Sequence, residues 1–361
     1  MSTVDKTRKQ HPQDGVVLLN GAELKPQPVD WLWRGWLAAG KLQLLAGSPG
    51  LGKTTLAMAM AAPVTSGGRW PDGSTCERGH VLMWSGEDDP ADTLKPRLVA
   101  AGGDDSRIFF VTGYRSRGEL LPFDPSRHMA QLQAEAERIG DVRLIIVDPI
   151  VTAVSGDSHK NTEVRRGLQP LVDLAAALRA ALIGITHLSK GGGDPVERVT
   201  GSIAFSAVPR IIMLAGKTES SDGDERRILA RGKSNIGPEG DGFEYHIEQS
   251  EPFPGIESSC VVWGDALHGP VRDLLSGEFD AVEANEKVSR VATAEAFLRR
   301  VLCDGAVLSN DVMAEAASQG ISAASVRRAQ GNLGVDARKG KDTKWYWSLP
   351  RTTGPLNESD D

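Results

Sequence analysis

The segment Gly47–Thr54 constrains the fold of this chain more than any other feature of its sequence. It reads Gly-Ser-Pro-Gly-Leu-Gly-Lys-Thr, follows an apolar run of the strand type, and leads directly into a helical pattern. A glycine-rich turn between a strand and a helix lets backbone N–H groups and the positive end of the helix surround phosphate oxygens. A structural glycine turn is the alternative, but the flanking strand and helix favour a site for a nucleoside triphosphate.

The motif predicts a role for each of its polar residues. The predicted nucleotide-binding residues are Gly47, Ser48, Pro49, Gly50, Leu51, Gly52, Lys53, Thr54 and Thr55. The Lys53 ammonium is expected to neutralise the β and γ phosphates, and the Thr54 hydroxyl is expected to bind Mg²⁺. A second apolar run, Leu144–Asp148, ends in an aspartate that is expected to hold the same ion from a strand end. The expected cofactors are therefore ATP and Mg²⁺, although no residue that would distinguish ATP from GTP can be named.

A general base is expected away from the Asp148 strand. Many P-loop ATPases place the water-activating glutamate directly after this aspartate, but here the next residue is Pro149. The apolar run Val81–Ser85 leads into Gly-Glu-Asp-Asp, so Glu87 is predicted to orient or deprotonate the attacking water. The alternative is that these acids only begin a helix at Pro90, where the helix dipole favours negative charge.

Short apolar runs alternate with helical patterns from Lys41 onward, which predicts an α/β fold with a mostly parallel central sheet. The expected strands are Leu42–Ala46, Val81–Ser85, Ile108–Val111, Leu144–Asp148, Leu182–Thr186 and Ile211–Leu214. The expected helices are Thr54–Ala62, Pro90–Ala101, Ser126–Ile139 and Thr162–Ala180. Two further segments, Arg226–Arg231 and Phe243–Ile247, are expected to extend the sheet in the antiparallel sense. Three tryptophans within Trp31–Trp36 favour core packing over contact with a base.

The 361 residues fit two domains rather than one. We expect a flexible segment at 1–25, an ATPase domain at 26–262, a linker at 263–288, a winged-helix-like domain at 289–350 and a disordered tail at 351–361. Helical signals at Val291–Leu302, Asn310–Ser318 and Ala323–Asn332, followed by the aromatic and basic segment Asp336–Leu349, are the basis for the winged-helix prediction.

Composition narrows the function classes. The formal net charge of −7 excludes a chain coated with positive charge, so any nucleic-acid contact must come from local basic segments. No apolar run is long enough for a membrane span, and the polar first residues predict a cytoplasmic protein without membrane partners. The three cysteines are far apart, which argues against a zinc site and a disulfide framework.

Together these motifs resemble the RecA/DnaB-type ATPase superfamily, and most closely the plasmid RepA-type hexameric replicative helicases and related AAA ATPases of phages and mobile elements. The resemblance covers roughly residues 31–247 and implies a RecA-like P-loop NTPase core. In that family the catalytic glutamate follows the second strand, as Glu87 does here, and the Walker B aspartate matches Asp148. Ile185–Lys190 looks like the family's sensor motif, in which His187 would couple the γ-phosphate to a mobile DNA-contacting loop.

The resemblance also implies an oligomer, expected to be a hexameric ring. Residues 201–204 followed by Arg210 resemble the family's short helix and finger arginine, and residues 231–238 resemble its K-x-R/N-x-G-P segment, with Asn235 in place of the arginine that some relatives carry. Arg210, Arg231 or Lys233 would then reach the γ-phosphate bound by a neighbouring subunit. An ordinary surface salt bridge is the alternative for each cation.

Basic residues predict three places for DNA contact. They are Lys190 and Arg198 in the glycine-containing loop Ser189–Thr200, Lys160 in the loop Val154–Asn161, and Arg327, Arg328, Lys339 and Lys341 in the C-terminal domain. Within that domain Ile321–Trp347 carries a net charge of +4 in an otherwise acidic chain. A solvated loop is the alternative for the first two places, and docking of a protein is the alternative for the third.

The leading hypothesis is a Mg-ATP-driven, ring-forming DNA motor, namely a replicative helicase of a plasmid, phage or other mobile element. Its expected partners are further copies of the chain, single-stranded DNA in a central channel, and a replication initiator or primase. Two alternatives stay open. One is a RecA/RadA-like recombination or repair ATPase, and the other is a KaiC-like regulatory switch whose winged helix binds DNA or protein.

Overall fold

The computed structural model describes residues 16, 18–154, 160–189, 196, 198–199, 203–219 and 225–350. The predictions made for Lys190, the glycines at 191–193 and the tail at 351–361 lie outside these residues, as does most of the segment at 1–25.

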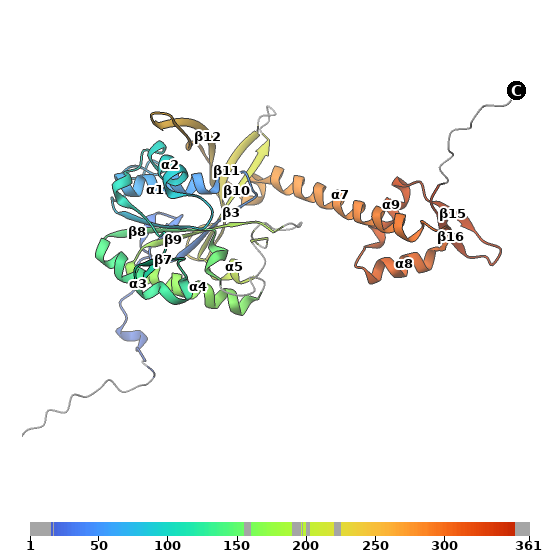
Figure 1. Cartoon of the computed structure of the whole chain (residues 1–361), viewed down its shortest axis with the longest axis horizontal. Helices are drawn as coiled ribbons and strands as arrows, with labels where there is room; N and C mark the ends of the chain where they lie inside the picture. The colour runs from blue at the N-terminus through green and yellow to red at the C-terminus, as the bar shows by residue number, and fades with distance from the viewer. Residues whose placement is uncertain are drawn as a thin grey trace, which may run out of the picture.

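A nine-stranded sheet forms the centre of the large domain (Figure 1). Its order is β13-β12-β11-β10-β3-β9-β8-β4-β5. The strands are β3 (Leu42–Gly47), β4 (His80–Ser85), β5 (Ile108–Phe110), β8 (Val142–Asp148), β9 (Ala181–His187), β10 (Ile211–Glu219), β11 (Glu225–Ser234), β12 (Gly242–Phe253) and β13 (Ile256–Leu267). The strands from β10 to β5 are parallel, and β11–β13 continue the sheet antiparallel. The predicted α/β fold with a mostly parallel sheet is confirmed.

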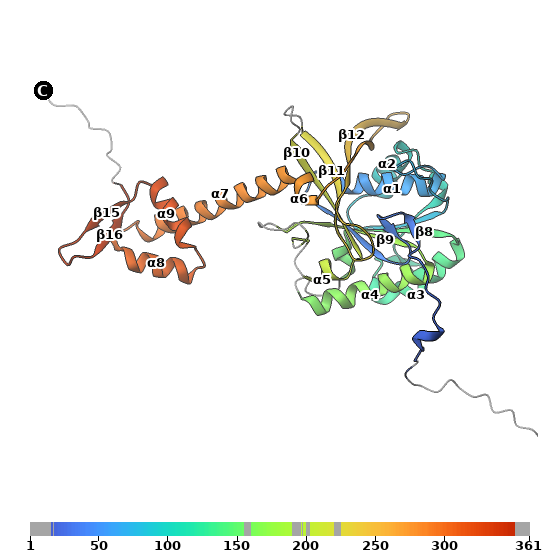
Figure 2. The same cartoon turned by 180° about the vertical axis from the view of Figure 1, so that it is seen from behind.

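Helices cover both faces of the sheet, as a parallel sheet requires. Figures 1 and 2 show α1 and α2 on one face and α3, α4 and α5 on the other. Their bounds are α1 (Lys53–Ser66), α2 (Lys95–Ala100), α3 (Pro125–Ile139), α4 (Asn161–Leu178) and α5 (Ile203–Ala207), with short helical turns η2 (Pro90–Leu94), η3 (Asp105–Arg107) and η4 (Ile150–Ala153). Leu144 and Ile146 of β8 pack toward α1, while Ile145 and Val147 pack toward α4. This alternation explains the continuous apolar run in the sequence.

The tryptophan-rich segment is part of the core, as predicted. It forms a small hairpin of β1 (Trp31–Trp33) and β2 (Leu37–Ala38). The Trp33 side chain is fully buried and stacks on Trp36 and Trp70 with ring centroids 4.9 Å apart in both pairs. Phe243 of β12 lies 5.7 Å from the same ring. The hairpin therefore ties the start of the domain to the antiparallel end of the sheet.

Parallel register places several strand ends at one edge. In the pairing of β3 with β9, Gly47 is opposite His187, and in the pairing of β4 with β8, Ser85 is opposite Asp148. The segments that follow these strands carry the predicted phosphate loop and Glu87. The carboxyl edge of the sheet is therefore where the predicted reactive groups meet.

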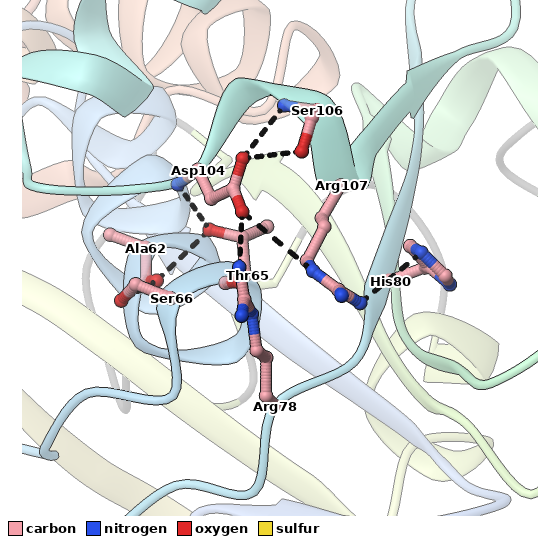
Figure 3. Close-up of polar contacts among 8 residues, drawn as sticks. All are labelled: Ala62, Thr65, Ser66, Arg78, His80, Asp104, Ser106 and Arg107. Atoms are coloured by element: carbon pink, nitrogen blue, oxygen red, sulfur yellow. Dashed lines mark hydrogen bonds and ion pairs between the residues drawn. The ribbon is translucent and has the colours of Figure 1, made fainter.

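A polar network joins elements at the amino-terminal edge, around Asp104 (Figure 3). The Asp104 carboxylate accepts hydrogen bonds from Ser106 and pairs with Arg78, which together lower the pKa of Asp104 to about 2. The backbone N–H of Asp104 donates to the Thr65 hydroxyl near the end of α1 at 3.0 Å. Arg107 reaches Asp104 and lies 3.4 Å from the His80 ring at the start of β4. The network holds the far end of α1 against β4.

Two small elements complete the large domain. Strands β6 (Tyr114–Ser116) and β7 (Glu119–Leu121) form a hairpin of their own after β5. The short helical turn η1 (Gly21–Glu23) precedes β1 and buries no residue.

The last strand of the large domain extends past residue 262, where the ATPase domain was expected to end. Strand β13 continues to Leu267, and the segment expected as a linker at 263–288 contains the end of β13, α6 (Val271–Leu274) and the first part of α7 (Ser276–Val301). Figure 1 shows α7 leading away from the sheet to the small unit. Polar helix-forming residues explain why a segment rich in charge is helical here.

The C-terminal unit combines helices with a small three-stranded sheet, and the winged-helix assignment for it stays a prediction. The end of α7 is followed by β14 (Val307–Leu308), α8 (Ser309–Ser318), α9 (Ala323–Asn332), β15 (Asp336–Lys339) and β16 (Trp345–Ser348). The strands pair in the order β14-β16-β15. Phe297, Leu298, Val312, Val326 and Trp347 share one small core.

The buried Trp33 ring yields a stability prediction. Trp33→Ala should lower the free energy of unfolding by about 3–5 kcal/mol because it leaves a large cavity among stacked rings. Leu120→Ala, at a side chain that is 59% exposed on β7, should change it by less than about 0.5 kcal/mol. Urea unfolding followed by far-ultraviolet circular dichroism measures both, and equal effects of the two substitutions would contradict the assignment of Trp33 to the core.

Candidate nucleotide-binding site

The loop between β3 and α1 adopts a shape that only glycine tolerates. Gly50 and Gly52 have φ values of +81° and +73°. A Cβ on Gly52 would lie 2.4 Å from the Cδ1 atom of Ile247, and a Cβ on Gly47 would lie 2.5 Å from the carbonyl oxygen of Ala215. Positive φ and close packing together explain the glycines of the motif. The backbone is thereby held in the open turn that can surround phosphate.

Lys53 begins α1 and points into its own loop. Its side chain is 6% exposed, and its ammonium donates to the Ser48 carbonyl at 3.0 Å. The same ammonium lies 3.1 Å from Nδ1 of His187. Because an ammonium can only donate, Nδ1 accepts this hydrogen bond and the ring is neutral. Burial and the nearby Lys53 charge lower the pKa of His187, which agrees with a neutral ring.

Thr54 and Asp148 form the second pair of the site. The Thr54 hydroxyl donates to Oδ2 of Asp148 at 2.7 Å, and Asp148 is 3% exposed. The pKa of Asp148 is raised to about 6, chiefly by burial and also by the negative charges of Glu87 and Asp88, while the hydrogen bond from Thr54 and the charge of Lys53 oppose the shift. A hydroxyl and a carboxylate at this distance form an oxygen donor set of the kind that Mg²⁺ prefers. Bound to these oxygens, the ion would offset the charge of the phosphates.

Glu87 lies in the same cavity as these groups. The cavity, of about 260 Å³, is lined by Lys53, Thr54, Glu87, Asp148 and His187, together with Gly50, Gly52, Thr55, Asp88, Arg97, Pro149, Ile185 and Thr186. The N–H of Gly86 donates to the Asp148 carbonyl at 2.8 Å, so the turn bearing Glu87 is fixed to the Asp148 strand. The helix start at Pro90 is capped by Asp89, whose carboxylate accepts from Ala91 and Asp92. Capping therefore does not account for Glu87.

Two contacts of this site were not anticipated from the sequence. Arg97 of α2 lines the cavity and pairs with Asp88 at 2.8 Å. The buried Tyr245 hydroxyl donates to the Leu51 carbonyl at 2.7 Å and so fixes the phosphate loop from β12. Tyr245 is separated from Leu51 by almost 200 positions, and no motif marks it. Only the position of β12 in the sheet brings the two together.

The three cations predicted to act on a neighbouring subunit have different surroundings. Arg210 is exposed and precedes β10, where its N–H donates to the Leu42 carbonyl. Lys233 lies beside it, because Asn235 N–H donates to the Arg210 carbonyl, and the Lys233 ammonium donates to the Ser206 carbonyl at 2.8 Å. Both lie at the amino-terminal edge of the sheet, away from the chain's own phosphate loop.

Arg231 is placed differently, because its side chain is held inside its own domain. Its side chain is buried, donates to the Gly240 carbonyl at 2.9 Å and pairs with Asp241 at 3.0 Å. Its guanidinium also lies 4.9 Å from the centre of the Trp36 ring. A guanidinium held this way would have to leave these partners to reach a neighbouring subunit, and the role of Arg231 in trans stays a prediction.

The two described cations of the predicted DNA loops differ in their exposure to solvent. Arg198 is buried and its guanidinium donates to the Ser189 carbonyl at 3.2 and 3.3 Å, where it closes the base of the loop instead of facing solvent. Its predicted contact with DNA stays a prediction. Lys160 is exposed just before α4 and lies 3.3 Å from Glu163.

The basic residues of the C-terminal unit face solvent. Arg327 and Arg328 are exposed on α9, and Lys339 and Lys341 are exposed at the turn between β15 and β16. The unit therefore presents positive charge on α9 and on the β15–β16 hairpin.

The geometry defines the class of the protein, a P-loop nucleotide-binding ATPase fold of the RecA-like type. The chain belongs to a family described as the AAA domain, whose model matches residues 6–193, just over half of the sequence.

Two further comparisons concern single proteins. The chain is similar to a DNA repair protein RadA from Streptococcus pneumoniae (strain ATCC BAA-255 / R6), with 27% identity over 162 residues. That match covers 44% of this chain and 32% of the relative, so the chain spans about a third of the relative's length. Among solved structures, a KaiC-like protein from Pyrococcus horikoshii OT3 aligns with a TM-score of 0.45 and 17% identity, over 64% of this chain and 99% of the other. Within the described residues, no helix has the length and apolar character to cross a membrane.

The buried Asp148 carboxylate predicts a dependence of stability on pH. Its pKa in the folded protein, about 6, exceeds the ordinary value of 3.8, so ionisation costs stability as pH rises from about 4 to 6. Asp148→Asn keeps an acceptor for Thr54 and removes the charge. Without nucleotide and Mg²⁺, this variant should be more stable than the wild type by roughly 2–3 kcal/mol at pH 7, and the difference should vanish near pH 4.

Thermal or urea unfolding at a series of pH values measures this difference. Asp273→Asn, at an exposed acid of α6, provides the matched control and should show no such trend. A variant at position 148 that is less stable than the wild type at pH 7 would contradict the assigned charge penalty.

Proposed function

We propose that the chain hydrolyses ATP with Glu87 as the general base. The observation that carries this proposal is the shared cavity, in which Glu87 faces Lys53, Thr54 and Asp148. The Glu87 carboxylate would orient and deprotonate the attacking water, while Lys53 would stabilise charge on the β and γ phosphates. His187 at the end of β9 accepts a hydrogen bond from the Lys53 ammonium. If a phosphate drew the ammonium away, His187 would lose this hydrogen bond.

We further propose that this hydrolysis drives a DNA motor. His187 is followed at once by Leu188 and Ser189, which pair with Val199 and Arg198 at the base of the predicted DNA loop. A movement of the His187 side chain could therefore be transmitted through Leu188 and Ser189 to the base of that loop. The exposed basic residues of α9 and the β15–β16 turn supply a second surface for a phosphate backbone.

The full proposal is a ring-forming replicative helicase of a mobile element, with single-stranded DNA, further copies of the chain, and an initiator or primase as partners. Arg210 supports the ring, because it is exposed at the edge of the sheet away from its own phosphate loop. The similarity to a protein named for DNA repair favours a second candidate, a repair or recombination ATPase. A regulatory ATPase switch is the third.

Two assays distinguish the three candidates. Strand displacement on forked DNA is expected only for the helicase. ATP turnover stimulated by single-stranded DNA without unwinding would replace the helicase with the repair ATPase. Turnover that is indifferent to DNA would favour the switch.

Glu87→Gln tests the assignment of the base. The substitution keeps the size of the side chain but removes its basicity, so ATP turnover should fall roughly 10²–10⁴-fold while the affinity for ATP changes little. Asp92→Asn, at an exposed acid of η2 outside the cavity, should retain wild-type turnover. Steady-state kinetics with nucleotide-binding titrations measure both, and normal turnover of the glutamine variant would remove Glu87 from the mechanism.

A mixing experiment tests whether Arg210 acts on the neighbouring subunit. Arg210→Ala and Glu87→Gln proteins should each be nearly inactive alone. In a mixture of equal amounts, about a quarter of the interfaces would join an intact Glu87 site to an intact Arg210, so activity should reappear. A mixture as inactive as its components would show that Arg210 does not act in trans.

A further inference from the structure

A second and larger cavity lies at the amino-terminal edge of the sheet. It has a volume of about 510 Å³ and lies between α4, the start of β3 and the turn from α5 into β10. Three cations line it, Lys41 before β3, Arg165 on α4 and Arg210 before β10. Gln169 is the neutral polar side chain of the lining, and the remaining lining residues are glycine or apolar. We refer to this cavity as the cationic groove.

Among the residues that the structure describes, no acid balances the charges of the cationic groove. Lys41, Arg165 and Arg210 make no side-chain hydrogen bond or ion pair with any residue that the structure describes, and no acid is among the described lining residues. Arg165 and Arg210 are exposed and Lys41 is half-buried. Three cations from three separate elements around one hollow raise the local concentration of anions. The groove therefore has the chemistry of a site for several phosphate groups.

The lining favours a phosphodiester backbone over a free nucleotide. No aromatic ring lines the described part of the groove, so a base would have no stacking partner. Gln169 alone offers an amide, which is too little to read a base edge. Cations spread over three elements match phosphates that follow one another along a strand, whereas a free nucleotide would leave its base without contacts.

The position of the cationic groove agrees with this ligand. Asn161 at the start of α4 accepts a hydrogen bond from the N–H of Ala204 in α5 at 3.1 Å. The elements that follow the two predicted DNA loops are thus joined to each other. Arg165 lies one helical turn after Asn161, on the α4 face that borders the groove. Single-stranded nucleic acid bound at the two predicted DNA loops would therefore lie next to the cationic groove.

We propose that the cationic groove binds the phosphate backbone of single-stranded nucleic acid without reading its bases. The proposal rests on the DNA-motor function proposed above and adds a contact outside the predicted loops. Lys41 and Arg165 carry it, and Arg210 lies at the rim that faces a neighbouring copy in the proposed ring.

The test compares Arg165→Ala and Lys41→Ala with Arg166→Ala in the full-length protein. Arg166 has the same charge and is exposed one position along α4, but it does not line the groove. Fluorescence anisotropy with labelled oligo-dT, in the presence of a non-hydrolysable ATP analogue, gives the affinity at several salt concentrations. Arg165→Ala and Lys41→Ala should each weaken binding several-fold and reduce the slope of log affinity against log salt by about 0.7. Arg166→Ala should match the wild type, and ATP turnover without DNA should be unchanged in all three.

Each other result contradicts a defined part of the proposal. Equal effects of Arg165→Ala and Arg166→Ala, or wild-type binding by all three variants, would overturn the groove and leave the DNA motor standing. A wild-type protein that does not bind oligo-dT would overturn both. Loss of affinity for inorganic tripolyphosphate with unchanged affinity for oligo-dT would assign the groove to a free polyphosphate. Reduced ATP turnover without DNA would assign it to contact between subunits.

Discussion

The parallel pairing of β3 with β9, of β9 with β8 and of β8 with β4 brings the groups that line the nucleotide cavity to one edge of the sheet. Parallel strands end at one edge, so the loops that follow them converge there whatever their separation in the sequence. Gly47 is opposite His187 and Ser85 is opposite Asp148. The β3–β9 register brings Lys53 within 3.1 Å of His187. The β9–β8 pairing then places Asp148 within reach of Thr54, whose hydroxyl donates to it at 2.7 Å. A shift of either register would separate these groups.

The same edge concentrates charge of both signs. Lys53 and Asp148 are buried at one end of the sheet, with Glu87 and the Asp88–Arg97 pair around them. Burial disfavours charge, which is why the pKa of Asp148 is raised and the pKa of His187 is lowered. A polyphosphate would pair with the Lys53 ammonium, and a divalent cation would pair with the Asp148 carboxylate.

Much of the fold and of the phosphate site could be predicted from the sequence because their signals are local. The glycine-rich loop, the apolar run ending in Asp148 and the alternation of strands with helices each lie within a short window. The contacts of Tyr245 and Arg97 could not be predicted, since they depend on how distant elements pack. Nor could the sequence show that Arg231 and Arg198 are buried and hydrogen-bonded to backbone carbonyls. The charge of a residue can be read from the sequence, whereas its accessibility cannot.

The hydrogen bond from Tyr245 to the Leu51 carbonyl has a consequence for how the site comes into being during synthesis. A growing chain that has just passed His187 already contains every residue of the phosphate-binding constellation. It still lacks β12, and with it the hydroxyl and the Ile247 side chain that pack against the loop. The phosphate loop would therefore gain its full support only after the antiparallel strands have left the ribosome and joined the sheet. This happens well after the glycine-rich motif itself has been synthesised.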